Sequence, residues 1–245
     1  MDLGLDGKRA LVTGGSRGIG RAIVLGLATG GASVAACYNR ESADVERLRD
    51  ELEQVGGTSY LAQADISDAR SVERFVGDAV ERFGGLDIVI NNAGVVSHAM
   101  LQDLTLEEWH RVIDTNLTAI YLVAKAAVPS MGAGASIVNI TSAVAMRGMP
   151  ARTHYISSKA GVVGITRALC KELGRGGIRV NAVAPGIIET DQTADLDEAG
   201  RARYAGLAAL NRLGTPEEIA NVALFFASDA ASFVDGVTLN VDGGI

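Results

Sequence analysis

Short apolar runs alternate with longer amphipathic segments along almost the whole of this 245-residue chain. The apolar runs lean toward β-branched residues and are often bounded by Gly, Asp or Ser, which is typical of strands. They lie at residues 9–13, 33–38, 59–64, 86–91, 136–141, 178–184 and 237–241. The segments between them have helical periodicity, for example at residues 20–30, 44–55, 70–83 and 217–228. Because strands this hydrophobic need helices on both faces, the pattern predicts an α/β fold with a doubly wound parallel sheet of about seven strands.

Composition and charge narrow the class of protein further. Hydrophobic residues make up 48% of the chain, and no linker-like or low-complexity stretch interrupts it, so we expect a single domain over residues 1–245. The formal net charge of −7 disfavours nucleic-acid binding, which needs a basic face. The start lacks a basic segment followed by an apolar one, and no apolar run reaches ~18 residues, so neither a secretory signal nor a membrane span is expected. Cys37 and Cys170 are interpreted as reduced thiols of a cytoplasmic protein.

The stretch "TGGSRGIG", residues 13–20, follows the first strand and leads directly into a helix. In a doubly wound sheet this turn lies at the carboxyl edge of the strands, where ligands bind. Glycines there let the backbone approach a pyrophosphate, and the helix N-terminus adds free N–H groups and a partial positive charge. The spacing G-x3-G-x-G differs from the usual dinucleotide fingerprint, but its position predicts a nucleotide site. The candidate residues are Gly14, Ser16, Arg17, Gly18, Ile19 and Gly20.

The end of the second strand indicates which dinucleotide binds. A cofactor with a free ribose 2′-hydroxyl usually meets an acidic residue there, and this chain has Tyr38, Asn39 and Arg40 instead. Arg40 and Arg17 together suit a 2′-phosphate, because guanidinium grips phosphate with paired hydrogen bonds. The alternative is that both are solvated surface arginines. NADP(H) is therefore preferred over NAD(H). Further cofactor contacts are expected after the third and fourth strands, at Asp65, Ile66, Asn92, Ala93 and Gly94.

Tyr155 and Lys159 are four residues apart in "HYISSK", in a segment that continues as a helical pattern. Residues with this spacing share one face of a helix. One interpretation is an aromatic packed in the core with a lysine extending past it. The other is that the lysine charge lowers the pKa of the phenol, so that the phenol exchanges a proton near neutral pH.

Five short motifs occur in a fixed order: "TGGSRGIG", "NNAG" at 91–94, Ser142 after the fifth strand, "YISSK", and "PGIIET" at 185–190. Together they resemble the short-chain dehydrogenase/reductase family over essentially the whole chain. The C-terminal stretch "RLGTPEEIANVALFFASDAASFVDGVTLNVDGG" looks most like the branch that reduces 3-oxoacyl thioesters and polyketide ketones. The resemblance implies a Rossmann-type fold and a catalytic set made of Asn116, Ser142, Tyr155 and Lys159.

By this resemblance, Tyr155 donates a proton to a carbonyl oxygen while hydride arrives at carbon from the nicotinamide. Lys159 also binds the nicotinamide ribose, Ser142 hydrogen-bonds the substrate oxygen, and Asn116 holds a water that links Lys159 to solvent. The loop after the sixth strand is implied to contact the nicotinamide end of the cofactor through Pro185, Gly186, Ile188 and Thr190. The polar, alanine-rich residues 189–212 read as a mobile lid over the substrate.

The expected activity is NADPH-dependent reduction of a ketone, either a 3-oxoacyl thioester or a polyketide-type ketone, to a secondary alcohol. The alternatives are an NAD(P)-dependent dehydrogenase acting on a small alcohol, sugar or steroid, and a nucleotide-binding protein without catalysis. An acyl carrier protein is a possible partner, although residues 129–136 carry no basic residue to dock it. Pocket candidates are mostly apolar and neutral, which favours an uncharged substrate: Val95, Val96, Ala143, Val144, Met146, Met149 and His154.

Two further expectations concern metals and assembly. No catalytic metal is expected, because His98, His110 and His154 have no ligand-like spacing. The resemblance implies a homotetramer, assembled through the helices after the fourth and fifth strands and through the C-terminal strand region.

Overall fold

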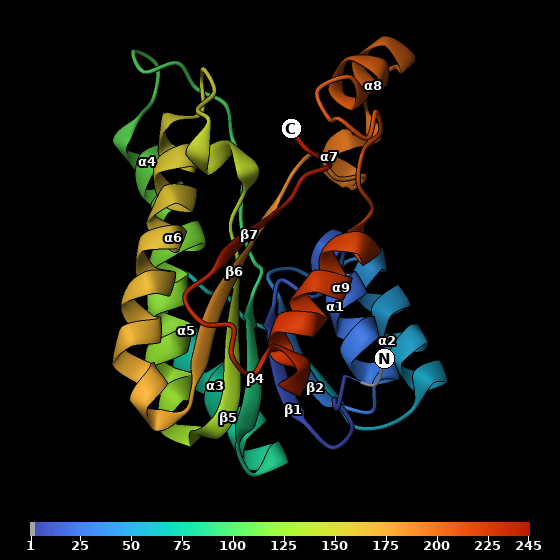
Figure 1. The fold of residues 1–245 in the computed structure, drawn as a ribbon, viewed down its shortest axis with the longest axis vertical. Helices are drawn as coiled ribbons and strands as arrows, with labels where there is room; N and C mark the ends of the chain where they lie inside the picture. Colours follow the sequence, from blue (N-terminus) through green and yellow to red (C-terminus); the bar gives the residue numbers. More distant parts are fainter. Residues whose placement is uncertain (1–2) are drawn as a thin grey trace.

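A computed structural model describes residues 3–245, apart from the side chain of Gln192, and contains one sheet of seven parallel strands (Figure 1). The order across the sheet is β3-β2-β1-β4-β5-β6-β7. The strands are β1 Arg9–Thr13, β2 Ser33–Tyr38, β3 Ser59–Gln63, β4 Leu86–Asn91, β5 Met131–Ile140, β6 Arg179–Pro185 and β7 Thr238–Val241. The predicted doubly wound parallel sheet is therefore confirmed.

The predicted strand boundaries agree with the structure most closely where the strand is buried. The strands expected at 9–13, 33–38 and 86–91 match residue for residue, those expected at 59–64 and 237–241 differ by one residue at one end, and that expected at 178–184 is shifted by one residue at both ends. The exception is β5, which begins at Met131 and not at residue 136. Its first four residues are wholly or partly exposed, and Gly and Ala there give no apolar signal for a strand.

Helices cover both faces of the sheet (Figure 1). They are α1 Gly18–Thr29, α2 Ala43–Val55, α3 Ala69–Phe83, α4 Leu106–Ile113, α5 Ala119–Ala127, α6 Thr153–Leu173, α7 Asp191–Ala194, α8 Glu198–Ala205 and α9 Pro216–Ala227. Helices α1, α2 and α9 lie on one side, and α3, α5 and α6 lie on the other (Figure 1). Among the described residues, no helix is long and apolar enough to cross a membrane.

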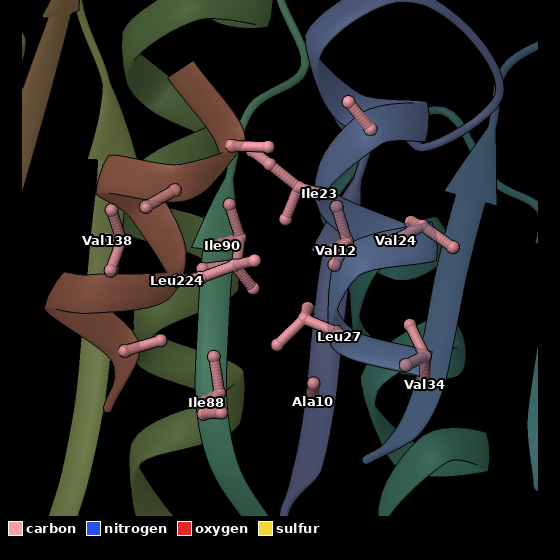
Figure 2. Close-up of a cluster of buried hydrophobic side chains, with 14 of the residues drawn as sticks. Ala10, Val12, Ile23, Val24, Leu27, Val34, Ile88, Ile90, Val138 and Leu224 are labelled. Atoms are coloured by element: carbon pink, nitrogen blue, oxygen red, sulfur yellow. The ribbon is translucent and has the colours of Figure 1, made fainter. Parts of the chain in front are cut away.

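The sheet separates two hydrophobic cores. Figure 2 shows the first, in which side chains of α1 and α9 such as Ile23, Leu27 and Leu224 pack over Val12 of β1 and Ile90 of β4. The second core joins the opposite faces of the same strands to α3, α5 and α6. Alternate residues of one strand therefore serve different cores, which explains why these strands are hydrophobic throughout instead of alternating with polar residues.

The strand order reverses between β1 and β4, which pair in parallel. From β1 the chain builds outward to β2 and β3, whereas β4 to β7 build outward on the other side. Loops at such a switch point leave toward opposite faces of the sheet, so a ligand can bind between them. The glycine loop after β1 and the loop after β4 meet here, and α7 and α8 lie beyond the same end of the sheet (Figure 1).

Candidate active site

Helix α6 carries Tyr155 and Lys159 on its buried face. Both side chains are buried, as are Val162, Thr166 and Cys170 further along the same helix. The four-residue spacing therefore places the phenol and the ammonium on the face that packs against the sheet, as predicted from the sequence. Water has little access to either side chain, so the pKa values of Tyr155 and Lys159 depend on the protein groups around them.

The Tyr155 phenol lies against the residues that follow β5 and precede α6. A hydrogen bond with Ser142 and the positive charge of Arg152 both act to lower the pKa of Tyr155, but burial outweighs them and raises this pKa above its ordinary value of 10.0. The Arg152 guanidinium carbon is 5.9 Å from the centre of the tyrosine ring. The phenol is therefore protonated at neutral pH and has an oxygen partner in place.

Lys159 is directed to the end of β5. Its Nζ donates a hydrogen bond to the backbone carbonyl oxygen of Ile140 at 2.9 Å, and its own carbonyl accepts one from the Thr141 hydroxyl at 2.7 Å. Burial lowers the pKa of Lys159 from 10.5 to about 8. Because this value is still above neutrality, Lys159 carries a positive charge at pH 7.

The expectation that Lys159 lowers the pKa of Tyr155 is wrong for this structure. The groups that lower this pKa are Ser142 and Arg152, and Lys159 is not among them. The physical reason is that the lysine ammonium is engaged by the Ile140 carbonyl, while desolvation of the phenolate is the largest contribution at Tyr155. What the structure retains of the prediction is the shared helix face and the buried positive charge.

Asn116 lies in a π-helical turn, Asp114–Thr118, between α4 and α5. The helix expected around it is thus interrupted at this residue, as often happens at functional sites. Its Oδ1 accepts a hydrogen bond from Val95 N at 2.8 Å, and its Nδ2 donates to Val95 O and to Ser158 Oγ, each at 3.0 Å. Both amide hydrogens are used within the chain, so the water proposed for this residue has only Oδ1 to donate to.

Close backbone approaches bring the loops of the site together. A Cβ atom on Gly14 would lie 2.8 Å from Ala93 Cα, and one on Gly94 would lie 3.4 Å from Lys159 Nζ. A Cβ on Gly18 would lie 3.3 Å from Thr190 Cγ2. The glycine loop, the loop after β4, helix α6 and the loop after β6 therefore converge at one edge of the sheet.

The glycine loop fits a dinucleotide phosphate. Gly14 has a φ of 65°, and a Cβ on Gly20 would lie 2.0 Å from the Gly14 carbonyl oxygen, so neither position accommodates a side chain. Helix α1 begins at Gly18 without a side-chain cap and without an acidic residue in its first turn. Its first N–H groups are thus available to an anion. Ser16 and Ile19 are half-buried in this turn, and Arg17 is exposed.

The expected 2′-phosphate site contains one unpaired arginine and one paired arginine. Arg40 is exposed and makes no ion pair within the described part of the chain, and Asn39 beside it is exposed as well. Arg17 Nη1 is 3.2 Å from Asp191 Oδ2 at the start of α7. Tyr38 is buried, and its hydroxyl donates a hydrogen bond to Glu41. The acidic residue Asp191 therefore lies near this site, although it is 174 residues away from Arg17 in the sequence.

Other expected cofactor residues occupy the same edge. Asp65 is exposed after β3, and its Oδ1 accepts from Ser67 N at 2.9 Å and Ser67 Oγ at 2.7 Å, which leaves Oδ2 for a ligand; Ile66 is buried. Pro185 ends β6, and Gly186 N donates to Val241 O at 3.0 Å. The last two residues expected in this loop have structural roles too, with Ile188 in a bridge to Gly214 and Thr190 capping α7.

Asn92 has a structural role at the glycine loop. Its Nδ2 donates to Thr13 O at 3.1 Å and to Gly14 O at 2.8 Å, so the side chain braces the glycine loop. Thr13 completes this brace, because its Oγ1 accepts from Asn92 N and Ala93 N, each at 3.1 Å. Sequence reasoning missed Thr13, although its position directly before the glycine loop was a usable signal.

Sequence reasoning also missed a set of polar residues behind the site. Ser158 on α6 accepts a hydrogen bond from Asn116 Nδ2 at 3.0 Å, which links Asn116 to this helix, and donates one to Tyr155 O at 2.6 Å. A buried chain of amides runs from Asn91 Nδ2 to Asn139 Oδ1 at 2.8 Å and from Asn139 Nδ2 to Thr166 Oγ1 at 2.9 Å. These bonds fix α6 relative to β4 and β5, so the site rests on satisfied buried groups.

The pocket prediction for His154 is wrong. His154 is fully buried, with 0% of its surface exposed, whereas Met146 and Met149 are exposed and Val95, Val96 and Val144 are partly exposed. Ala143 is buried. The ring lies in the first turn of α6 and is enclosed by protein, so it lines no open pocket. Within the described residues, no group of three His, Cys, Asp or Glu side chains is placed to hold a metal ion.

Comparison with known proteins gives consistent matches over the full chain. A family model described as "Enoyl-(Acyl carrier protein) reductase" matches residues 14–245. A 3-oxoacyl-[acyl-carrier-protein] reductase, FabG, of Chlamydia muridarum is 42% identical over 240 residues, which cover 97% of each chain.

Solved structures agree with these matches. A dehydrogenase/reductase from Sinorhizobium meliloti is 36% identical with a TM-score of 0.95, over 99% of this chain and 96% of that one. A short-chain dehydrogenase from Burkholderia cenocepacia in complex with NADP is 36% identical with a TM-score of 0.93, over 98% of both chains.

Proposed function

We propose that this chain, which belongs to the short-chain dehydrogenase/reductase family, reduces the ketone of a 3-oxoacyl thioester or a polyketide-type compound to a secondary alcohol with NADPH. The observation that carries the proposal is the buried Tyr155 phenol, hydrogen-bonded with Ser142 and one helical turn from the Lys159 ammonium. A phenol beside an orienting hydroxyl and a fixed positive charge is a device for protonating an oxygen anion.

In this proposal each group of the site has one role. Ser142 donates a hydrogen bond to the carbonyl oxygen, and Tyr155 gives its proton to the same oxygen as negative charge develops there. Lys159 keeps a positive charge in the same buried region, where the Ile140 carbonyl holds it, and would hydrogen-bond the nicotinamide ribose of the cofactor. Asn116 keeps the loop after β4 against α6 and accepts a water that returns protons from solvent.

The protonation state of Tyr155 favours reduction over oxidation. A reductase needs the neutral phenol as its acid, whereas alcohol oxidation by the same residue begins from the phenolate. Since burial raises the pKa of Tyr155, the neutral form dominates at physiological pH. This supports a reductive role over the alternative of a secondary-alcohol dehydrogenase.

NADP(H) is the proposed cofactor, and it would supply the hydride. The free N–H groups at the start of α1 would bind its pyrophosphate, and Arg40 and Arg17 its 2′-phosphate. Asp65 and Ile66 would bind the adenine, and Ala93 and Gly94 leave space for its ribose. The nicotinamide end would lie near Lys159 and the loop of Pro185, Gly186, Ile188 and Thr190. A related protein has been solved in complex with NADP, which supports this choice.

For the substrate we propose an uncharged acyl or polyketide body. Three segments carry exposed apolar side chains, with Leu101 before α4, Met146 after β5, and Leu210 in the segment 189–212. That segment contains α7 and α8, and we propose that it acts as a mobile lid. An acyl carrier protein is a possible donor of the substrate, because the related FabG proteins are named for that carrier.

We further propose that the protein assembles as a homotetramer in the cytoplasm. Strand β7 is an edge of the sheet, and Leu239 within it and Phe233 before it are exposed, as is Tyr121 on α5. An uncovered edge strand with apolar neighbours favours association of like chains. Both cysteines are free and buried, which is consistent with a reducing compartment. Light scattering tests the assembly, and a monomer would contradict this part of the proposal.

A panel of ketones tests the proposed activity. The panel contains 3-oxoacyl thioesters of coenzyme A and of acyl carrier protein, cyclic ketones, quinone-like polyketides and an enoyl thioester, each followed by loss of NADPH absorbance. We expect turnover of a 3-oxoacyl thioester or a polyketide ketone and none of the enoyl thioester. Turnover of the enoyl compound alone, or faster alcohol oxidation with NAD, would overturn the proposal.

A further inference from the structure

A chain of hydrogen bonds joins α4 to the first turn of α6 through the loop after β4. Ser97 Oγ lies 2.5 Å from His154 Nε2, and the same hydroxyl hydrogen-bonds the Glu108 carboxylate. Arg111 holds that carboxylate with two bonds, from Nε and Nη2, each at 2.7 Å. His154 directly precedes Tyr155 in the sequence, so this series of hydrogen bonds ends beside the proposed proton donor.

The number of protons in this series of hydrogen bonds determines the tautomer of His154. An ionised carboxylate only accepts hydrogen bonds, so the Ser97 hydroxyl donates its single proton to Glu108. In the contact with His154 the serine oxygen is then the acceptor, and Nε2 must carry the proton. Nδ1 is left with a bare lone pair, and this buried atom has no hydrogen-bond partner among the described residues. A second proton on Nδ1 would be buried without an acceptor, so the ring is held neutral.

The charges around the ring agree with a neutral His154. Burial lowers its pKa, and Arg111 and His98 lower it further, while Glu108 opposes them. Arg111 and Glu108 come from α4, and His98 comes from the loop after β4, where it contacts Arg152 Nη2 at 3.1 Å. The ring is fully buried, so it acts on the site through its neighbours and does not touch a substrate.

A second contact joins the same two segments. Ala99 N donates to Ala151 O at 2.9 Å, and Ala99 forms a bridge with Arg152. The loop after β4 is thus attached to the start of α6 by backbone at Ala99 and by side chains at Ser97. Ser142 and Arg152 are also the two groups that lower the pKa of the Tyr155 phenol. Movement of the loop after β4 relative to the start of α6 would therefore displace Tyr155 relative to these partners.

We propose that His154 is a positioning residue, which fixes the Tyr155 phenol by donating its Nε2 proton to Ser97 and thereby locking the start of α6 to Glu108 on α4. The inference rests on the proposed reductase function for its kinetic consequence. Its structural part, the tautomer and the hydrogen bond, stands independently of any substrate.

Nitrogen-15 NMR of the histidine rings tests the structural part. The chain has three histidines, so His98→Gln and His110→Gln variants assign the spectrum. We expect His154 to show the neutral Nε2–H tautomer at neutral pH, and we expect Ser97→Ala to shift its Nε2 signal. An Nδ1–H tautomer, or a doubly protonated His154 ring at neutral pH, would overturn the proposal.

A double-mutant cycle tests the kinetic part with the best ketone of the panel. We expect Ser97→Ala and His154→Leu each to lower kcat by about 10-fold, and the double variant to lose no more than either single one. His154→Gln, which keeps a side-chain N–H donor, should recover most of the loss, and His110→Gln is the matched control. NADPH affinity, measured by fluorescence, should be unchanged throughout.

The outcomes separate the two proposals. Losses that multiply to about 100-fold in the double variant, or the absence of any loss, would overturn the positioning role of His154. A wild-type chain that reduces no ketone would instead overturn the proposed function, and the NMR result would still decide the hydrogen bond. If His154→Leu does not fold, Ser97→Ala and His154→Gln give the same decision.

Discussion

Lys159 Nζ donates a hydrogen bond to the carbonyl oxygen of Ile140 at 2.9 Å, which holds the ammonium at the end of β5. The charge is therefore positioned by the sheet and not by contact with Tyr155. Its burial is unfavourable for stability, because the pKa of Lys159 falls from 10.5 to about 8. A buried titratable group with a strongly shifted pKa is a candidate functional residue. The first two predictions concern this residue.

Replacing Lys159 by Met should stabilise the protein while abolishing turnover. The folded pKa lies below the unfolded one, so between pH 8 and 10.5 the unfolded chain binds more protons and wild-type stability rises with pH. At pH 7 the full penalty applies, and the variant should be more stable by about 1–3 kcal/mol in urea unfolding. This gain should shrink as the pH rises through that window. A variant that is less stable than wild type at pH 7 would contradict this prediction.

The pH dependence of ketone reduction should show an alkaline fall near pH 8. This fall follows loss of the Lys159 charge, because the raised pKa of Tyr155 keeps the phenol protonated beyond that pH. Lys159→Arg should move the fall to higher pH, since guanidinium keeps its proton to about pH 12 or above. The measurement is kcat against pH with saturating NADPH, and an unmoved limb in the arginine variant would assign the fall to another group.

Arg40→Ala should weaken the binding of NADPH without affecting the binding of NADH. Arg40 is exposed and unpaired within the described residues, so its only expected partner is the 2′-phosphate. Removing such a charge-assisted contact should raise the KM for NADPH by about 10-fold or more and leave that for NADH within about twofold. Arg74→Ala, at an exposed position of α3, is the matched control. Equal changes with both cofactors would contradict a phosphate contact.

Thr13→Val should loosen the glycine loop. The hydroxyl of Thr13 accepts two backbone hydrogen bonds, and valine keeps its shape but leaves Asn92 N and Ala93 N without this acceptor. We expect a loss of about 1–3 kcal/mol in the free energy of unfolding, together with weaker NADPH binding. Thr58→Val, at an exposed position, should change neither quantity. Unchanged stability in Thr13→Val would show that the loop does not depend on this brace.

The sequence was most informative where burial and periodicity act together. Strand β2 was predicted to the residue because it is buried almost throughout, and the shared face of Tyr155 and Lys159 follows from their spacing alone. The first residues of β5 were missed because Gly132, Ala133 and Gly134 are exposed and carry no strand signal.

Other features depend on tertiary contacts that leave no pattern in a sequence. The π-helical turn at Asp114–Thr118 differs from an α-helix by its hydrogen bonds and not by its composition. The partner of Lys159 is a backbone carbonyl, which any residue supplies, so its identity could not be read in advance. The roles of the Thr13 and Ser158 hydroxyls could not be predicted either, because their partners Asn92 and Asn116 lie far away in the sequence.

The most direct test replaces Tyr155 by Phe, which removes the hydroxyl and preserves the buried ring. NADPH affinity is measured by fluorescence, and ketone reduction by loss of NADPH absorbance, on the same preparation. The proposed mechanism predicts unchanged cofactor binding and a fall in kcat of about 10²- to 10⁴-fold, the usual contribution of a general acid. Turnover equal to that of the wild-type chain would contradict it, because no proton donor would then be needed at this position.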